Sequence, residues 1–260
     1  MTGLNAIRDS LNVQVVDTGK PDLPEQGATV LDREGLSHIW SARYTDLDRF
    51  YPDLSVLVSP EEQHRAAGFK KTGDARRYML RHGLLRAILE HYTEESPVKL
   101  SFIYGRSGKP DLDTKGKFPD IRFSLSCTDE MVCVGITRKS AIGLDIIRTQ
   151  PRYSFPAIEH YLFEPGERRW IAQAVPDRRP FRFVRVWALK EAILKATGGD
   201  VRIMKEVDVS RIMTDTFLGG FYMVNTGERD QRFFIHESGY DPGHHCTLAV
   251  IPWTAGKADN

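Results

Sequence analysis

The order of expected secondary structure repeats along the chain, and this repetition is what most limits the folds it can adopt. Alternating apolar residues and turn residues predict strands at 38–44, 98–104, 121–126, 131–137 and 141–147, and in FLGGFYMV, QRFFIHE and CTLAVIPW. Helical spacing and caps predict helices from Ser59, over 74–92, and near 154–163, 165–174 and 181–197. A strand, then helices, then antiparallel strands therefore occurs in each half.

This order predicts an α/β (α+β) fold built as a pseudo-dimer of two similar halves, each with helices packed on a mainly antiparallel sheet. Residues 1–27 are interpreted as a polar N-terminal extension, 28–140 as the N-terminal half and 141–256 as the C-terminal half. We expect the ligand cleft between the halves, because such interfaces are favoured binding places.

Composition excludes several classes of protein. The formal net charge of +1 over 260 residues argues against a nucleic-acid binder. The N-terminus shows no signal-peptide pattern, and no stretch approaches the roughly 20 apolar residues that span a bilayer. We therefore expect a cytoplasmic monomer without nucleic-acid or membrane partners. The three cysteines lack CxxC spacing, so neither a disulfide framework nor a zinc site is predicted.

Asp145 stands inside the apolar strand IGLDII, where an unpaired carboxylate would cost several kcal/mol. One interpretation is a strand end that reaches solvent. The other is a cation ligand, because magnesium is held by one or two protein carboxylates together with water and substrate phosphate. Glu191, in the helix WALKEAILKA, could supply the second carboxylate. Lys195 lies one turn further and would face the same phosphate, although Glu191 and Lys195 could also form an ordinary surface salt bridge.

Positive charge is concentrated between residues 65 and 86, where a single acid, Asp74, accompanies Arg65, Lys70, Lys71, Arg76, Arg77, Arg81 and Arg86. This run fits either a solvated helix face or a site for a phosphorylated ligand, since arginine suits phosphate oxygens. GRSGKPDL also places Lys109 in a loop between two strands.

Taken in order, these segments resemble the 4′-phosphopantetheinyl transferases of the surfactin-synthetase-activating (Sfp) type. The matching segments are SPEEQHRAAGF, RRYMLRHGLLRAIL, GKPDL, FSLSC, IGLDI, FEPGERRW and FRFVRVWALKEAILKATGGD. The WxxKEAxxKAxG element and the IGxDI strand are the specific parts of this resemblance.

The resemblance implies transfer of phosphopantetheine from coenzyme A to a serine of an acidic acyl or peptidyl carrier protein, with Mg²⁺ as cofactor. It implies that Asp145 and Glu191 are metal ligands and, with Lys195, catalytic residues. The implied coenzyme A-binding residues are Arg65, Arg77, Lys109, Ser126, Cys127 and Lys195. Glu167 aligns with an acidic position near the active site.

Two positions depart from the family pattern. Ile147 stands where a second acid often follows the strand aspartate, and Cys127 replaces the histidine that helps to hold the 3′-phosphate. A thiol is a poor substitute for that histidine. Two alternatives therefore remain: a coenzyme A-binding homologue with little or no transferase activity, and an interaction domain whose basic helix docks an acidic protein.

Overall fold

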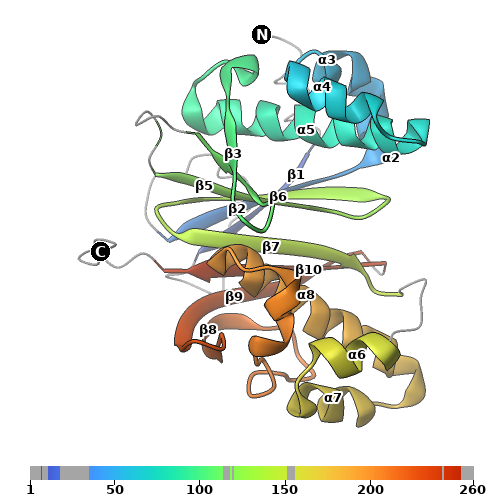
Figure 1. Cartoon of the computed structure of the whole chain (residues 1–260), viewed down its shortest axis with the longest axis vertical. Helices are drawn as coiled ribbons and strands as arrows, with labels where there is room; N and C mark the ends of the chain where they lie inside the picture. Colours follow the sequence, from blue (N-terminus) through green and yellow to red (C-terminus); the bar gives the residue numbers. More distant parts are fainter. Residues whose placement is uncertain are drawn as a thin grey trace.

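The computed structural model describes residues 7, 11–17, 35–113, 118, 120–150, 156–241 and 243–252. It is an α+β structure of two halves, each with helices packed on an antiparallel sheet, as Figure 1 shows. The fold class predicted from the sequence is confirmed. Of the helices that the structure describes, none combines the length and apolar character needed to cross a bilayer.

The N-terminal half contains a sheet of order β1-β2-β6-β5. Its strands are β1 (Asn12–Asp17), β2 (Leu36–Arg43), β5 (Ile121–Cys127) and β6 (Met131–Arg138). Its helices are α2 (Tyr44–Leu47), α3 (Tyr51–Ser55), α4 (Pro60–Ala67) and α5 (Thr72–Thr93), and the hairpin β3 (Phe102–Tyr104)–β4 (Pro110–Leu112) stands beside them. As predicted, α4 begins after Ser59, which forms a capping box with Glu62.

The C-terminal half contains a sheet of order β7-β10-β9-β8. Its strands are β7 (Ala141–Arg148), β8 (Gly219–Asn225), β9 (Asp230–Asp241) and β10 (His244–Ile251). Its helices are α6 (Pro156–Leu162), α7 (Pro165–Ala172) and α8 (Arg179–Thr197). The buried face of α8 carries Val186, Leu189 and Ile193, which share one side of the helix at helical spacing.

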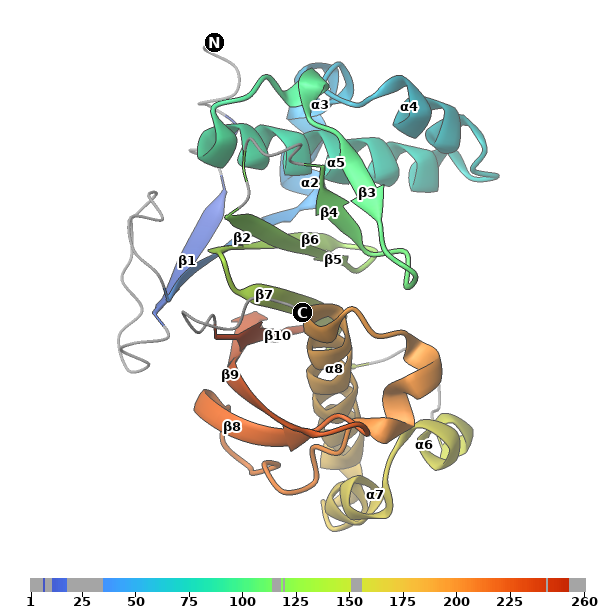
Figure 2. The ribbon, with the colours of Figure 1, turned by 60° about the vertical axis from the view of Figure 1, so that its left-hand side comes forward.

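The two halves meet at β7, which lies between the sheet of the N-terminal half and helix α8 (Figure 2). Alternate residues of β7, Ile142, Leu144 and Ile146, join an apolar core between the two sheets. Serine hydroxyls of β5 bridge to the backbone of β7: Ser124 Oγ accepts from the N–H of Leu144 at 3.0 Å. The junction therefore combines apolar burial with hydrogen bonds that fix the register of the two edge strands.

Two segments differ from the sequence predictions. The strand expected at 98–104 is a 3₁₀ turn over Pro97–Lys99 followed by the short strand β3. Most of the predicted extension 1–27 lies outside the described residues, but Asn12–Asp17 forms β1, and Val15 is buried against the core. That stretch therefore lies in the sheet. The apolar residues of VQVV are typical of a strand, but the polar residues on both sides led to its interpretation as part of an extension.

Helix α8 approaches β7 so closely that a side chain at Gly143 has no room. A Cβ atom there would lie 1.8 Å from the carbonyl oxygen of Ala192 and 2.5 Å from the backbone nitrogen of Ala196. Because both are backbone atoms, the clash cannot be relieved by a side-chain rotation. Gly143 thus sets the distance between the strand that carries Asp145 and the helix that carries Glu191 and Lys195.

We predict that Gly143→Ala lowers the free energy of unfolding by about 3 kcal/mol or more, because the helix must move away from the strand. Gly219→Ala is the matched control, since its added Cβ meets no atom within 4 Å. The control should change stability by no more than about 0.5 kcal/mol in urea unfolding. Equal stabilities of the two variants would contradict the close helix–strand contact.

Candidate functional site

The site is centred on one carboxylate oxygen at the junction of the halves. Asp145 projects from β7 and is 7% exposed. Its Oδ1 accepts hydrogen bonds from Ser126 Oγ of β5 at 2.8 Å and from Lys195 Nζ of α8 at 2.7 Å. The sequence prediction that Asp145 is buried is confirmed, and the alternative of a strand end reaching solvent is wrong.

Lys195 is held in place by three acceptors. Besides Asp145, its amine donates to the carbonyl of Leu144 at 3.1 Å and to Ser126 Oγ at 3.2 Å. Burial alone would lower the pKa of this amine, but the negative charge and hydrogen bond of Asp145 outweigh burial and raise it. The amine therefore carries a full positive charge at neutral pH.

Glu191 lies one turn before Lys195 on α8 and is half-buried. Burial raises the pKa of this carboxyl, and the negative charge of Asp145 raises it further. Among the described residues, Lys195 forms its ion pair with Asp145 and not with Glu191. The alternative interpretation of Glu191 and Lys195 as an ordinary i,i+4 salt bridge is therefore wrong.

The residues fit a magnesium ion. Burial and then the negative charge of Asp145 raise the pKa of the Glu191 carboxyl, and a bound divalent cation would relieve the repulsion between the two carboxylates. The described contacts of Asp145 all use Oδ1, which leaves Oδ2 for a ligand. Magnesium is commonly held by one or two protein carboxylates, and Asp145 and Glu191 would be the two that hold it here.

Lys109 reaches the same junction from the loop between β3 and β4. Its amine donates to the carbonyls of Ile142 on β7 at 2.6 Å and Lys195 on α8 at 2.7 Å. It therefore ties the N-terminal half to both elements that carry the site. Its pKa is lowered to about 8, first by burial and then by the charge of Lys195, against the opposing effect of Asp111.

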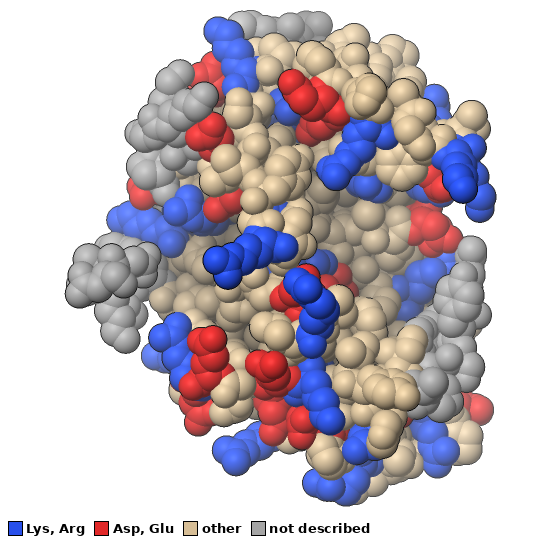
Figure 3. Space-filling model, in the orientation of Figure 1, with Lys and Arg blue, Asp and Glu red and all other residues tan. Residues whose placement is uncertain are grey.

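A cavity of about 380 Å³ opens beside Lys109 and Lys195 and is lined by both halves. From the N-terminal half come Tyr104, Ser107 and Arg122, and from the C-terminal half come Ala141 and Gly198. Figure 3 shows side chains of both charges meeting along the boundary between the halves. This cavity lies between the halves, where the ligand cleft was expected, and its size suits a small organic ligand.

The basic run of residues 65–86 divides into separate groups. Arg86 is 2% exposed and donates to Glu62 at 2.8 Å, so it stabilises the N-terminal core. Arg77 pairs with Asp74, and Arg76 pairs with Asp48 at 2.7 Å. Sequence charge alone did not distinguish these roles, because the partners of Arg76 and Arg86 lie more than twenty residues away.

Two further predicted binding residues are accessible. Arg65 is exposed near the end of α4. Cys127 follows Ser126 and is half-buried, and its sulfur accepts a hydrogen bond from Arg81 at 3.8 Å. Arg81 was one of several arginines in the basic run, and only the fold shows that it lies beside Cys127.

Glu167 is engaged in the C-terminal core. It is fully buried and accepts from Lys190 Nζ at 2.7 Å and from the backbone N–H of Val209 at 2.9 Å. It also closes the capping box at the start of α7 with Glu164. The buried ion pair with Lys190 gives Glu167 a structural role. These contacts do not support the predicted position of Glu167 near the active site.

Comparisons with known proteins identify relatives. A family model described as the 4′-phosphopantetheinyl transferase superfamily matches residues 141–249. The 4′-phosphopantetheinyl transferase HetI of Nostoc sp. is 26% identical over 178 residues, covering 68% of this chain and 75% of HetI. AcpT of Escherichia coli K12 is 29% identical over 123 residues, covering 47% of this chain and 60% of AcpT. The L-aminoadipate-semialdehyde dehydrogenase-phosphopantetheinyl transferase of Rattus norvegicus is 25% identical over 212 residues, covering 74% and 67% of the two chains.

We predict that Glu191→Gln stabilises the protein at pH 7. A raised pKa means that the ionised carboxylate costs folding free energy above its folded-state pKa, and that this cost is absent below the unfolded value of 4.5. Urea unfolding should therefore show a gain at pH 7 that disappears as the pH falls below 4.5. The control is Glu228→Gln, an exposed residue between β8 and β9, which should show no gain. A loss of stability in Glu191→Gln at pH 7 would contradict the repulsion described above.

The lowered pKa of Lys109 predicts a second pH effect. Between pH 8 and 10.5 the unfolded chain holds a proton that the folded protein releases, so the contribution of Lys109 to stability rises with pH. The difference in unfolding free energy between wild type and Lys109→Met should grow across this range. For Lys205→Met, at an exposed position, the unfolding free energy should change with pH as it does in the wild type. A constant difference between wild type and Lys109→Met would contradict a buried amine at the junction.

Proposed function

Because the chain belongs to the 4′-phosphopantetheinyl transferase superfamily, we propose that it transfers the 4′-phosphopantetheine group of coenzyme A to a serine hydroxyl of an acyl or peptidyl carrier protein. The by-product is adenosine 3′,5′-bisphosphate. The observation that carries this proposal is that Lys195 and Ser126 both donate hydrogen bonds to Oδ1 of Asp145. Glu191 lies on the same helix as Lys195.

The reaction needs neutralisation of pyrophosphate charge, an aligned nucleophile and removal of the serine proton. Lys195 supplies a positive charge that the site itself maintains, because Asp145 raises its pKa. This amine binds the pyrophosphate oxygens and stabilises the charge that develops on the leaving phosphate. When bound by Asp145 and Glu191, magnesium supplies further neutralisation of phosphate charge.

Glu191 is the proposed proton acceptor, and it accepts the serine proton directly or through one bridging water. Its raised pKa describes the site without a metal, and a carboxylate that holds a cation is a weaker base. Lys109 contributes by holding β7 and α8 in register through two carbonyls, which keeps Asp145 and Lys195 together. It also lines the cavity in which coenzyme A is proposed to bind.

Arg65 and Arg77 are proposed to contact coenzyme A or the acidic carrier protein from the surface of the N-terminal half. In Figure 3, basic side chains gather at the right-hand end of that half, where α5 begins. Surface charge of this kind accelerates encounter with an acidic partner and is weakened by salt.

The second candidate function is binding of coenzyme A with little or no transfer, and the observation that favours it is Cys127. Arg81 offers a compensation, because its guanidinium lies at the sulfur of Cys127 and can bind a phosphate in place of the family's histidine. Ile147 packs against the C-terminal core and contributes no third carboxylate. Two carboxylates are enough for a magnesium site, because water molecules complete the coordination of the ion.

We predict that mixing the protein with coenzyme A, Mg²⁺ and a panel of apo-carrier proteins adds the mass of one phosphopantetheine group to at least one carrier. Asp145→Ala and Glu191→Ala should each lower the rate more than about tenfold, a loss of about 1.4 kcal/mol of transition-state stabilisation. Glu228→Ala should leave the rate unchanged.

Binding of coenzyme A without a mass gain on any carrier would favour the second candidate. Transfer that persists in Asp145→Ala at more than a tenth of the wild-type rate would contradict the site assignment. Mass spectrometry of the carrier separates these outcomes.

A further inference from the structure

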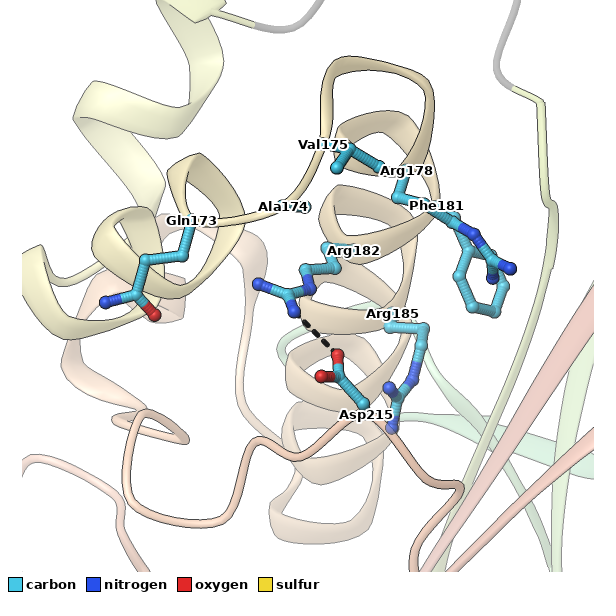
Figure 4. A pocket seen from close by; sticks show the side chains of 8 residues that line it. All are labelled: Gln173, Ala174, Val175, Arg178, Phe181, Arg182, Arg185 and Asp215. Carbon is cyan, nitrogen blue, oxygen red and sulfur yellow. Dashed lines mark hydrogen bonds and ion pairs between the residues drawn. The ribbon is translucent and has the colours of Figure 1, made fainter.

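A second cavity, of about 490 Å³, lies in the C-terminal half between the end of α7, the beginning of α8 and the loop that contains Asp215. Figure 4 shows three arginines of this region, Arg178, Arg182 and Arg185, with Asp215. Three arginines face one carboxylate in the lining, and Glu237 behind it neutralises Arg185, so one positive charge is left in excess (3 − 2). Its volume falls within the range of small-molecule sites.

Arg182 is already oriented toward an anion. Its side chain is 15% exposed, its guanidinium stacks 4.4 Å from the centre of the Trp170 ring, and it donates to the carbonyl of Trp170. Its Nη2 donates to Asp215 Oδ1 at 2.6 Å, although the side chain of Asp215 is 80% exposed. The carboxylate of Asp215 thus shows how an external oxyanion would bind Arg182. Because exposed ion pairs contribute little, a ligand can displace it at small cost.

Arg185 forms a fixed part of the same wall. It is 1% exposed and makes two hydrogen bonds to Glu237, at 3.0 and 2.7 Å, and two more to the carbonyls of Thr214 and Thr216. Burial alone would raise the pKa of Glu237, but hydrogen bonds from His245 and Arg185 lower it to about 2. Arg185 therefore anchors the loop that carries Asp215 to α8, so the cavity keeps its shape when Asp215 is displaced.

The rest of the cavity wall includes apolar side chains and the positively charged side chain of Arg178. Val175 is 64% exposed, and the ring of Phe181 lies against Phe217, which is itself 47% exposed. The guanidinium of Arg178 makes no hydrogen bond or ion pair with any residue that the structure describes. An arginine beside exposed aromatic and aliphatic side chains suits a ligand with both an anionic group and an apolar body.

This cavity is separate from the active site. Both are reached by α8, but Arg182 and Lys195 are thirteen residues apart, which is about 20 Å along a helix. The cavity shares no lining residue with the cavity beside Lys109 and Lys195.

We propose that this cavity is a second binding site, for a small organic anion whose phosphate or carboxylate group takes the place of Asp215 on Arg182 and whose flat apolar body packs against Phe181 and Val175. This inference does not depend on the transferase activity.

The test is calorimetric titration of the full chain with phenyl phosphate, and with phenylacetate in parallel to distinguish a phosphate from a carboxylate ligand. Arg182→Gln should weaken binding at least about tenfold, the loss expected for a charge-assisted hydrogen bond. Asp215→Asn should tighten binding several-fold, because it removes the internal competitor, and this gain cannot arise from misfolding. The matched control is Arg202→Gln, which removes an exposed arginine paired with Asp200 and should leave affinity unchanged.

Phenol and inorganic phosphate, tested alone, should each bind at least about tenfold more weakly than phenyl phosphate if both parts of the ligand are recognised. The proposal is overturned if Asp215→Asn fails to tighten binding, if Arg182→Gln and Arg202→Gln bind equally, or if neither probe binds wild type or Asp215→Asn. A transfer assay that fails would leave these results unaffected.

Discussion

The close contact of α8 with β7 at Gly143 is the constraint on which the rest of the site depends. Because the helix backbone lies against the strand, Lys195 reaches Asp145 at 2.7 Å and the carbonyl of Leu144 at 3.1 Å. The N-terminal half is attached at the same place, since Ser126 bonds to Asp145 and Lys109 bonds to both β7 and α8. The arrangement of Asp145, Lys195 and Ser126 is therefore a consequence of how the two halves are joined.

The electrostatics of this junction connect stability with function. Asp145 is compensated by Lys195, whereas Glu191 remains beside it without an ion pair to Lys195 among the described contacts. Burial of a second carboxylate near the first is unfavourable to folding unless a cation is bound. A pair of carboxylates and a maintained positive charge suit binding of a pyrophosphate with its metal, which is what the proposed transfer requires.

Asp145 could be singled out from the sequence because a charge inside an apolar strand is an anomaly that local pattern reveals. Glu191 and Lys195 alone also fitted an ordinary salt bridge, and the resemblance of the WxxKEAxxKAxG element singled them out. The roles of the arginines could not be predicted. Arg86 and Arg76 look alike in sequence, yet Arg86 is buried against Glu62 and Arg76 is at the surface with Asp48. Strand β1 was missed because its pairing with β2 is set by contacts across a long intervening segment.

The most direct test of this account is the position of the metal. Crystals grown with coenzyme A and Mn²⁺, a substitute for Mg²⁺ with a usable anomalous signal, would locate the ion by anomalous diffraction. We expect one strong peak between the carboxylates of Asp145 and Glu191, on the side of Asp145 Oδ2. A peak that contacts neither carboxylate, or coenzyme A bound with no metal peak at this junction, would contradict the account.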